Sequence, residues 1–281
     1  MIDPADPDQL FELLRRHRVD AKHSLGQNFL TDRTIRDAVA DAADIAHDDD
    51  VLEVGAGPGT LTVALARRCR RLVAVELDRR LIPALREVVD EHRNVEIVQA
   101  DILRYDIHAA FPQGGELVAG NIPYSLTGAL IEKLLQPTPR PKRLSLVVQK
   151  EVAERWTATT GASLATVAVQ VFADARMVMT IPAASFMPVP KVDSALVTLE
   201  VRERPAVEVD DMEAFFRFVE AVFQFRRKQV GGTVARIARA PNVDAASRLR
   251  ELGIDPVRRP QTLTLREWEQ LYRAFNPRFG R

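Results

Sequence analysis

Ten residues decide the fold of this chain: Val51-Leu52-Glu53-Val54-Gly55-Ala56-Gly57-Pro58-Gly59-Thr60. A short β-prone run leads directly into a turn that contains three glycines, and residues of helical period follow the turn. A strand, a glycine turn and a helix in this order leave backbone amides free to face a ligand. The segment therefore predicts a parallel sheet with a ligand site at the carboxyl ends of its strands.

The rest of the first two hundred residues or so continues this alternation. Apolar, β-branched runs are separated by longer segments of helical period. Such alternation predicts an α/β fold with a doubly wound, Rossmann-like sheet, mostly parallel, with an antiparallel closing strand. We expect parallel strands at Val51–Val54, Leu72–Glu76, Val95–Val98, Leu117–Ala119 and Leu144–Val148, helices within Leu61–Cys69, Leu81–Val89 and Leu126–Leu135 and at 164–172, and closing strands at Met177–Ile181 and Ala195–Val201.

The C-terminal part has a different character. Arg202–Glu213, which contains Pro205 and several acids, is typical of a linker. Beyond it the hydrophobic period is helical, with helices expected around 215–222, at Ala245–Leu252 and at Leu265–Phe275, and with Gly253 as a C-cap. The sequence therefore predicts two domains, residues 1–204 and a small all-helical domain at residues 210–281.

Composition limits the class of protein. The chain has 281 residues, 46% of them hydrophobic, and no apolar stretch reaches the length that a membrane helix needs. Because the N-terminus carries acids instead of a basic patch and an apolar run, we expect a cytoplasmic protein without a membrane partner. The single cysteine, Cys69, excludes an internal disulfide, and the histidines lack metal-ligand spacing, so we expect no metal site.

The charge is balanced overall but unevenly distributed. Lysine plus arginine equals aspartate plus glutamate at 39 each. Residues 210–281 hold 14 basic and 9 acidic residues, a net charge of +5, which leaves −5 for the first 209 residues. The basic region favours an anionic partner such as nucleic acid, with a solvated helical surface as the alternative.

Glycine or acidic residues lie at the carboxyl ends of three consecutive predicted strands. Gly55 and Gly57 follow the first, Glu76 ends the second, 21 residues after Gly55, and Asp101 follows the third. The separation of Gly55 and Glu76 in the sequence is typical of an acid that binds the ribose hydroxyls of a nucleotide cofactor. Asp101 could accept a hydrogen bond from an adenine amino group. The pattern predicts a nucleoside cofactor. The alternatives are a nicotinamide dehydrogenase and glycines that only close a tight turn.

The motif Asn121-Ile122-Pro123-Tyr124 falls at the end of the fourth predicted strand, beside this edge. The amino nitrogen of adenine is a poor nucleophile because its lone pair is delocalised into the ring. If the side-chain oxygen of Asn121 and a backbone carbonyl such as that of Pro123 accept its hydrogens, the lone pair turns toward a methyl donor. Tyr124 can stack on the base. The motif predicts methyl transfer to a base amino group, and the alternative is an Asn-Pro turn before a helix.

Five motifs, in order, resemble the ribosomal RNA adenine dimethyltransferases, most closely the bacterial small-subunit (16S) branch. The resemblance runs from about Lys22 to the C-terminus. Its motifs are Leu25-Gly26-Gln27-Asn28-Phe29-Leu30, Glu53-Val54-Gly55-Ala56-Gly57-Pro58-Gly59, Asn121-Ile122-Pro123-Tyr124, Phe186-Met187-Pro188-Val189-Pro190-Lys191-Val192-Asp193-Ser194 and Phe225-Arg226-Arg227-Lys228.

The resemblance implies S-adenosylmethionine as cofactor and the transfer of two methyl groups to each of two adjacent adenosines near the 3′ end of small-subunit ribosomal RNA. We expect the enzyme to be a monomer that binds its RNA substrate within a pre-30S or 30S particle. Phe186 is assigned to the target pocket, where it stacks on the base opposite Tyr124. The expected site residues are Gln27, Asn28, Leu30, Gly55, Gly57, Glu76, Asp101, Ile102 and Asn121 for the cofactor, Asn121, Pro123, Tyr124 and Phe186 for catalysis, and Arg226, Arg227 and Lys228 for RNA.

Three other functions compete with this interpretation. A nicotinamide dehydrogenase explains Gly55 to Glu76 but not Asn121–Tyr124. A ribosome-assembly or transcription factor would keep the fold as a non-catalytic binding module. Within the family, the rival is the large-subunit (23S) enzyme that confers antibiotic resistance, although Lys191-Val192-Asp193-Ser194 favours the small-subunit type.

Overall fold

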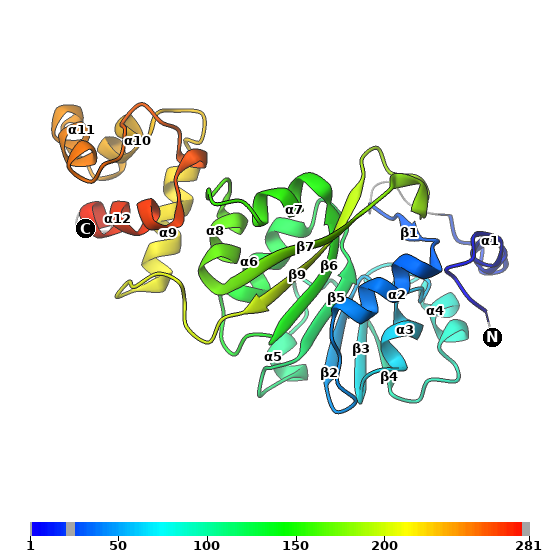
Figure 1. Ribbon diagram of the computed structural model, residues 1–281. Helices are drawn as coiled ribbons and strands as arrows, with labels where there is room; N and C mark the ends of the chain where they lie inside the picture. Colours follow the sequence, from blue (N-terminus) through cyan, green and yellow to red (C-terminus); the bar gives the residue numbers. More distant parts are fainter. Residues whose placement is uncertain (1, 21–25, 277–281) are drawn as a thin grey trace. The chain divides into compact units, whose positions relative to one another are not determined.

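A computed structural model describes residues 2–20 and 26–276, so Leu25 of the first motif lies outside the described residues (Figure 1). Contacts divide the chain into two compact units. The first contains Met1–Glu154 and Asp174–Val201, and the second contains Arg155–Ala173 and Arg202–Arg281. Residues 155–173 thus group with the C-terminal helices, which the sequence does not indicate. The expected division between residues 204 and 210 stays a prediction.

A seven-stranded sheet of order β4-β3-β2-β5-β6-β9-β7 forms the centre of the first unit. The strands from β4 to β6 pair in parallel, and β9 pairs with β6 antiparallel, which confirms the predicted Rossmann-like sheet. β7 begins at Ala173, directly after a helix that ends at Phe172, so it is longer than the predicted strand Met177–Ile181. The bounds are β2 Asp50–Val54, β3 Arg71–Glu76, β4 Val95–Gln99, β5 Leu117–Asn121, β6 Arg143–Gln149, β7 Ala173–Ile181 and β9 Ser194–Val201.

The strand order reverses between β2 and β5, in the middle of the sheet. The chain continues from β2 to β3 on one side and from β5 to β6 on the other. A crevice forms at the carboxyl ends of two such neighbours, which is where the glycine turn and Asn121 meet. The strands approach closely, since a Cβ added at Gly120 of β5 would lie 2.5 Å from the carbonyl oxygen of Val54 in β2.

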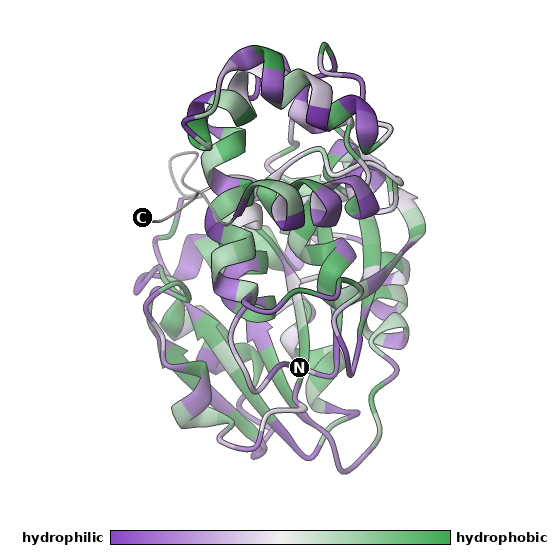
Figure 2. Cartoon of the chain, turned by 90° about the vertical axis from the view of Figure 1, so that its left-hand side faces the viewer, coloured by the Kyte–Doolittle hydropathy of each residue, from purple (hydrophilic) through white to green (hydrophobic). Residues whose placement is uncertain are grey.

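Helices pack apolar faces on this sheet. Val39 of α2 and Leu65 in α3 lie in one buried cluster with Val51 of β2 and Leu72 of β3. Figure 2 shows hydrophobic residues concentrated along the strands, while the helices carry both colours. The helices are α2 Arg33–Ala42, α3 Thr62–Ala66, α4 Ile82–Val88, α5 Ile107–Ala110, α6 Thr127–Leu135 and α7 Lys150–Trp156, with a 3-10 turn at Ala183–Ser185.

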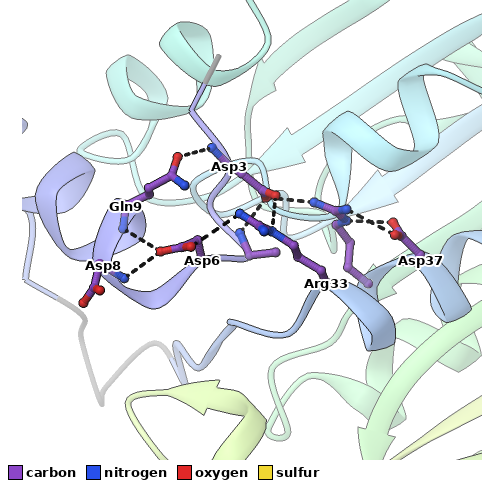
Figure 3. A network of polar contacts seen from close by, with 8 residues as sticks. Asp3, Asp6, Asp8, Gln9, Arg33 and Asp37 are labelled. Atoms are coloured by element: carbon purple, nitrogen blue, oxygen red, sulfur yellow. Dashed lines mark hydrogen bonds and ion pairs between the residues drawn. The ribbon is translucent and has the colours of Figure 1, made fainter.

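The N-terminal helix α1, Pro7–Arg16, is capped by Asp6, which accepts the backbone N–H groups of Asp8 and Gln9. A polar network joins the start of the chain to α2 (Figure 3). Arg36 of α2, only 7% exposed, donates to Asp3 at 2.8 Å and to Asp37 at 2.9 Å. A buried guanidinium is costly unless paired. Asp37 pairs with it from within α2, and the bond to Asp3 fixes the N-terminal segment to the helix.

Two short strands outside the main sheet join distant motifs. β1, Phe29–Leu30, pairs antiparallel with β8, Phe186–Met187, so that Leu30 lies opposite Phe186. The first and fourth sequence motifs are therefore neighbours in the fold.

The second unit is built from helices around an aromatic core. Phe215 and Tyr272 make an edge-to-face contact at 5.5 Å between ring centroids, and Phe172 stacks on Phe216 at the same distance. Asp211 caps a helix that begins at Met212, so the linker is shorter than the predicted Arg202–Glu213. Gly253 has φ 75°, as its predicted C-cap role requires. The elements are α8 Leu164–Phe172, α9 Met212–Phe223, α10 Val230–Ile237, α11 Asn242–Glu251, α12 Leu265–Phe275 and the 3-10 turn Pro260–Thr262.

No helix within residues 2–20 and 26–276 is long and apolar enough to cross a membrane.

Candidate active site

The glycine turn after β2 adopts a backbone that only glycine takes readily. Gly55, Gly57 and Gly59 have φ values of 71°, 57° and 96°. At Gly59 space is also limiting, because an added Cβ would lie 2.9 Å from Cγ1 of Val88. The Gly55 N–H donates to the carbonyl oxygen of Val75 in β3 at 2.9 Å, which fixes the turn on the sheet edge.

Glu76, at the end of β3, is held against this turn. Its Oε2 accepts the Gly57 N–H and its Oε1 accepts the Asp78 N–H, both at 2.7 Å. The residue is 6% exposed, and this burial raises the pKa of its carboxyl above the ordinary value. A carboxylate has about four acceptor positions, so Glu76 can still accept a hydrogen bond from a ligand beside those from the backbone.

A second acid, Glu53 of β2, lies deeper beneath the turn. It is 1% exposed, and its Oε2 has no hydrogen-bond partner in the described part of the chain. Burial raises the pKa of Glu53 to about 8, so its carboxyl is protonated at neutral pH. The acids that line the cavity at this edge are Glu76 and Asp101, and Glu53 does not line it.

Most of the predicted site residues surround one cavity at this edge. Among the predicted cofactor and catalytic residues, two do not line it: Leu30 and Phe186, which are 4% and 2% exposed and lie in the same hydrophobic cluster as Val147 and Leu196. The stacking of Phe186 on a base stays a prediction, and from this arrangement it requires the ring to leave the cluster. The predicted residues that line the cavity are Gln27, Asn28, Gly55, Gly57, Glu76, Asp101, Ile102, Asn121, Pro123 and Tyr124.

The side-chain amide of Asn121 has a defined orientation. Its Nδ2 donates to the backbone carbonyl oxygen of Asn28 at 2.7 Å. Because only the amide nitrogen can donate to a carbonyl, Oδ1 is left as the free acceptor at the cavity. The Pro123 carbonyl oxygen accepts the Leu126 N–H at 2.8 Å and keeps one lone pair. Two acceptors thus stand in one motif, as the transfer chemistry requires.

Tyr124 completes this wall of the cavity. Its hydroxyl lies 2.9 Å from the Oγ of Ser194, at the start of β9. Burial raises the pKa of Tyr124, so the phenol stays neutral. The hydrogen bond fixes the ring from its far end and leaves its face for stacking.

Several residues at the cavity do not stand out in the sequence. Asp78, two residues after Glu76, accepts the side-chain Nε2–H of Gln27 at 3.0 Å. A hydrogen bond from Arg80 holds the pKa of Asp78 down at about 2. Asp78 contacts the lining residue Gln27 without lining the cavity itself, whereas Leu77 lines it and is 50% exposed. The proximity of Asp78 and Leu77 to Glu76 at a strand end is the signal that could have found them.

The basic segment after α9 carries unpaired charge. Arg226, Arg227 and Lys228 are exposed and form no ion pair with any described residue. The guanidinium of Arg236 lies 4.8 Å from the ring centroid of Phe225. These cations belong to the second unit.

A sequence profile of the ribosomal RNA adenine dimethylase family matches residues 18–276. The chain belongs to this family. It is 39% identical over 290 residues to ribosomal RNA small subunit methyltransferase A of Geobacillus kaustophilus, covering 99% of both chains. The same named protein of Pelotomaculum thermopropionicum is 40% identical over 289 residues, covering 98% of both.

Two solved structures are similar to the dimethylase. The 23S rRNA methyltransferase ErmE aligns with a TM-score of 0.69 and 30% identity, over 89% of this chain and all of that chain. A dimethyladenosine transferase from Plasmodium falciparum aligns with a TM-score of 0.71 and 26% identity, over 89% of this chain and 98% of the other. Family membership excludes the dehydrogenase, and methyltransferases of this kind use S-adenosylmethionine.

We expect Glu76→Ala to weaken S-adenosylmethionine binding, because the ribose hydroxyls lose a charged acceptor worth about 1.5–3 kcal/mol. Calorimetry on the dimethylase would measure the dissociation constant. Glu96→Ala, which removes an exposed carboxylate from the neighbouring strand β4, is the matched control. Equal dissociation constants for the two variants would remove Glu76 from the cofactor site.

The affinity for S-adenosylmethionine should also depend on pH, because Glu76 titrates. Burial raises the pKa of Glu76, and the carboxylate accepts hydrogen bonds better than the acid. Affinity should therefore fall as pH decreases through that raised pKa, at a higher pH than for an ordinary glutamate. Glu76→Gln, which cannot titrate, should lack this phase. A Gln variant with the wild-type pH profile would assign the titration to another group.

Proposed function

We propose that the dimethylase transfers two methyl groups to the amino nitrogen of each of two adjacent adenosines near the 3′ end of small-subunit ribosomal RNA. The observation that carries the proposal is the oriented Asn121 amide, which leaves Oδ1 as an acceptor in a cavity that Pro123 also lines. The small-subunit assignment is supported by relatives of that name with 35–40% identity.

The residues of the cavity fit S-adenosylmethionine. Glu76 would accept from the ribose hydroxyls, and Asp101, whose Oδ1 accepts only the Leu103 N–H, would accept from the adenine amino group. Leu77 and Ile102 would pack on the flat faces of the adenine. The bound cofactor supplies an electrophilic methyl group on a sulfonium. Gly57 and Phe29 both line the cavity, and a Cβ at Gly57 would lie 3.4 Å from the ring of Phe29, so a larger residue there would narrow the cavity.

The transfer motif activates the target adenosine. Asn121 Oδ1 and the Pro123 carbonyl would accept the two amino hydrogens. This orients the amino group so that its lone pair is no longer delocalised into the ring and faces the methyl donor. The nitrogen lone pair would form the new N–C bond as the methyl–sulfur bond breaks, which leaves a thioether, and the positive nitrogen would then lose one hydrogen as a proton to solvent. Because the nitrogen becomes positive, the acceptors bind it more strongly in the transition state than in the ground state. In the second transfer one amino hydrogen remains to be accepted. Tyr124 would hold the base by stacking, worth about 1–3 kcal/mol. No covalent enzyme intermediate is needed.

The second unit would bind the RNA backbone. The RNA would be part of a pre-30S or 30S particle, and the enzyme would act as a monomer. Arg226, Arg227 and Lys228 are exposed and unpaired within the described residues, so no internal ion pair has to break when phosphates bind. Phosphate contacts of this kind supply affinity and position and leave base selection to the cavity.

The rival substrate is large-subunit ribosomal RNA, which the similarity to ErmE favours. The test is to incubate the enzyme and S-adenosylmethionine with under-methylated small subunits and, separately, with large-subunit RNA, and to map dimethyladenosine. We expect two adjacent modified adenosines near the 3′ end of the small-subunit RNA. Modification of the large-subunit RNA alone would establish the rival, and no modification of either would overturn the enzymatic assignment.

Replacing Arg226, Arg227 and Lys228 together with glutamine should weaken RNA binding and lower the slope of log affinity against log salt by about 0.7–0.9 for each lost phosphate contact. The control is the triple variant of Arg79, Arg86 and Arg93, which removes the same charge from exposed positions of the first unit. Identical slopes in the two triple variants would show that the C-terminal charges form a solvated surface.

A further inference from the structure

A second cavity of the first unit lies next to the wall that holds Tyr124. It is bounded by the carboxyl end of β6 and by the segment that leads into β9, and its volume is about 520 Å³. Its polar lining includes Gln149, Lys150, Lys191 and Asp193, and Val192 adds an apolar surface. None of these residues lines the cofactor cavity.

The main chain connects this second cavity directly to the transfer site. Gln149 lies opposite Ser194 in the β6–β9 register, and the Lys150 N–H donates to the Asp193 carbonyl oxygen at 3.1 Å. Ser194 is the residue whose hydroxyl lies 2.9 Å from the hydroxyl of Tyr124. The lining of the second cavity therefore begins one residue from the group that positions the stacking ring.

Its two lysines have no charged partner. Lys150 and Lys191 make no ion pair with any residue in 2–20 or 26–276. The acids nearby are already engaged. Asp193 Oδ1 accepts the Ala183 N–H at 3.0 Å, and Glu151 and Glu154, which also line the cavity, each have an interaction within the chain. Lys150 and Lys191 are the two cations of this lining that can contact an anion.

An apolar surface stands beside these cations. Val192, which lines the cavity, is 46% exposed, and Val189, which lies outside the lining in the same segment, is 64% exposed. Unpaired cations next to exposed aliphatic side chains match a nucleotide, which carries a phosphate charge and the flat apolar face of a base.

We propose that this second cavity holds the nucleotide that flanks the target adenosine, with Lys150 and Lys191 binding its phosphate. The inference rests on the proposed function, because an adenosine held against Tyr124 is joined through a phosphodiester to its neighbour. When two adjacent adenosines are both substrates, each adenosine is the flanking nucleotide of its neighbour. The second cavity would then hold one adenosine while its neighbour is methylated.

The test compares Lys150→Gln/Lys191→Gln with Lys142→Gln on the full-length enzyme. Lys142 is an exposed lysine without an ion pair at the opposite end of β6, so it is matched in chemistry and in strand. For each protein, RNA affinity is measured between 50 and 200 mM salt with under-methylated small subunits, and the KM for the same substrate is determined. S-adenosylmethionine affinity serves as the folding control.

For the double variant we expect the salt slope to fall by about 0.7 per lysine, as for phosphates of a single strand, and the KM for RNA to rise. Lys142→Gln should match the wild type in both. If the double variant has the wild-type slope and KM while the wild type still dimethylates small-subunit RNA, the flanking-nucleotide site is wrong and the proposed function stands. Failure of the wild type to methylate at all contradicts the proposed function itself.

Discussion

The Nδ2 of Asn121 donates to the carbonyl oxygen of Asn28 at 2.7 Å, and the chemistry of the site depends on this bond. A side-chain amide can turn over by half a rotation, which exchanges a donor for an acceptor. Here that rotation would place oxygen against oxygen, so Oδ1 is retained as the acceptor for an adenine amino group. The bond also joins the segment before β1 to the end of β5, so the cofactor-binding and transfer motifs form one site.

The position of Asn28 is in turn fixed by structure on both sides of it. Leu30 pairs with Phe186 in the β1–β8 ribbon, and Gln27 donates to Asp78 at 3.0 Å, beside Glu76. Farther back, the buried pairing of Arg36 with Asp3 holds the N-terminus to α2, the helix that follows β1. The first two contacts, between distant parts of the sequence, set the place of the Asn28 carbonyl, and the third fixes the N-terminus on the next helix.

The sequence predicts the parts of this site that depend on local pattern. The glycine turn, the parallel strands and the spacing from Gly55 to Glu76 follow from short-range rules, and the fold confirms the sheet they predict. The β1–β8 ribbon could not be predicted, because strands of two residues carry no periodicity and their partners are chosen by packing. For the same reason the burial of Phe186, the Gln27–Asp78 bond and the grouping of residues 155–173 with the C-terminal helices are visible only in three dimensions.

The most direct test of the account is the single-turnover rate of Asn121→Ala at saturating S-adenosylmethionine and RNA. Saturation removes any loss of cofactor affinity, so the rate reports the chemical step alone. Losing one preorganised partner of the transition state should slow methyl transfer at least about 10²-fold and leave RNA affinity nearly unchanged. A variant that transfers methyl groups at close to the wild-type rate under these conditions would contradict the account and reduce Asn121-Ile122-Pro123-Tyr124 to a turn before a helix.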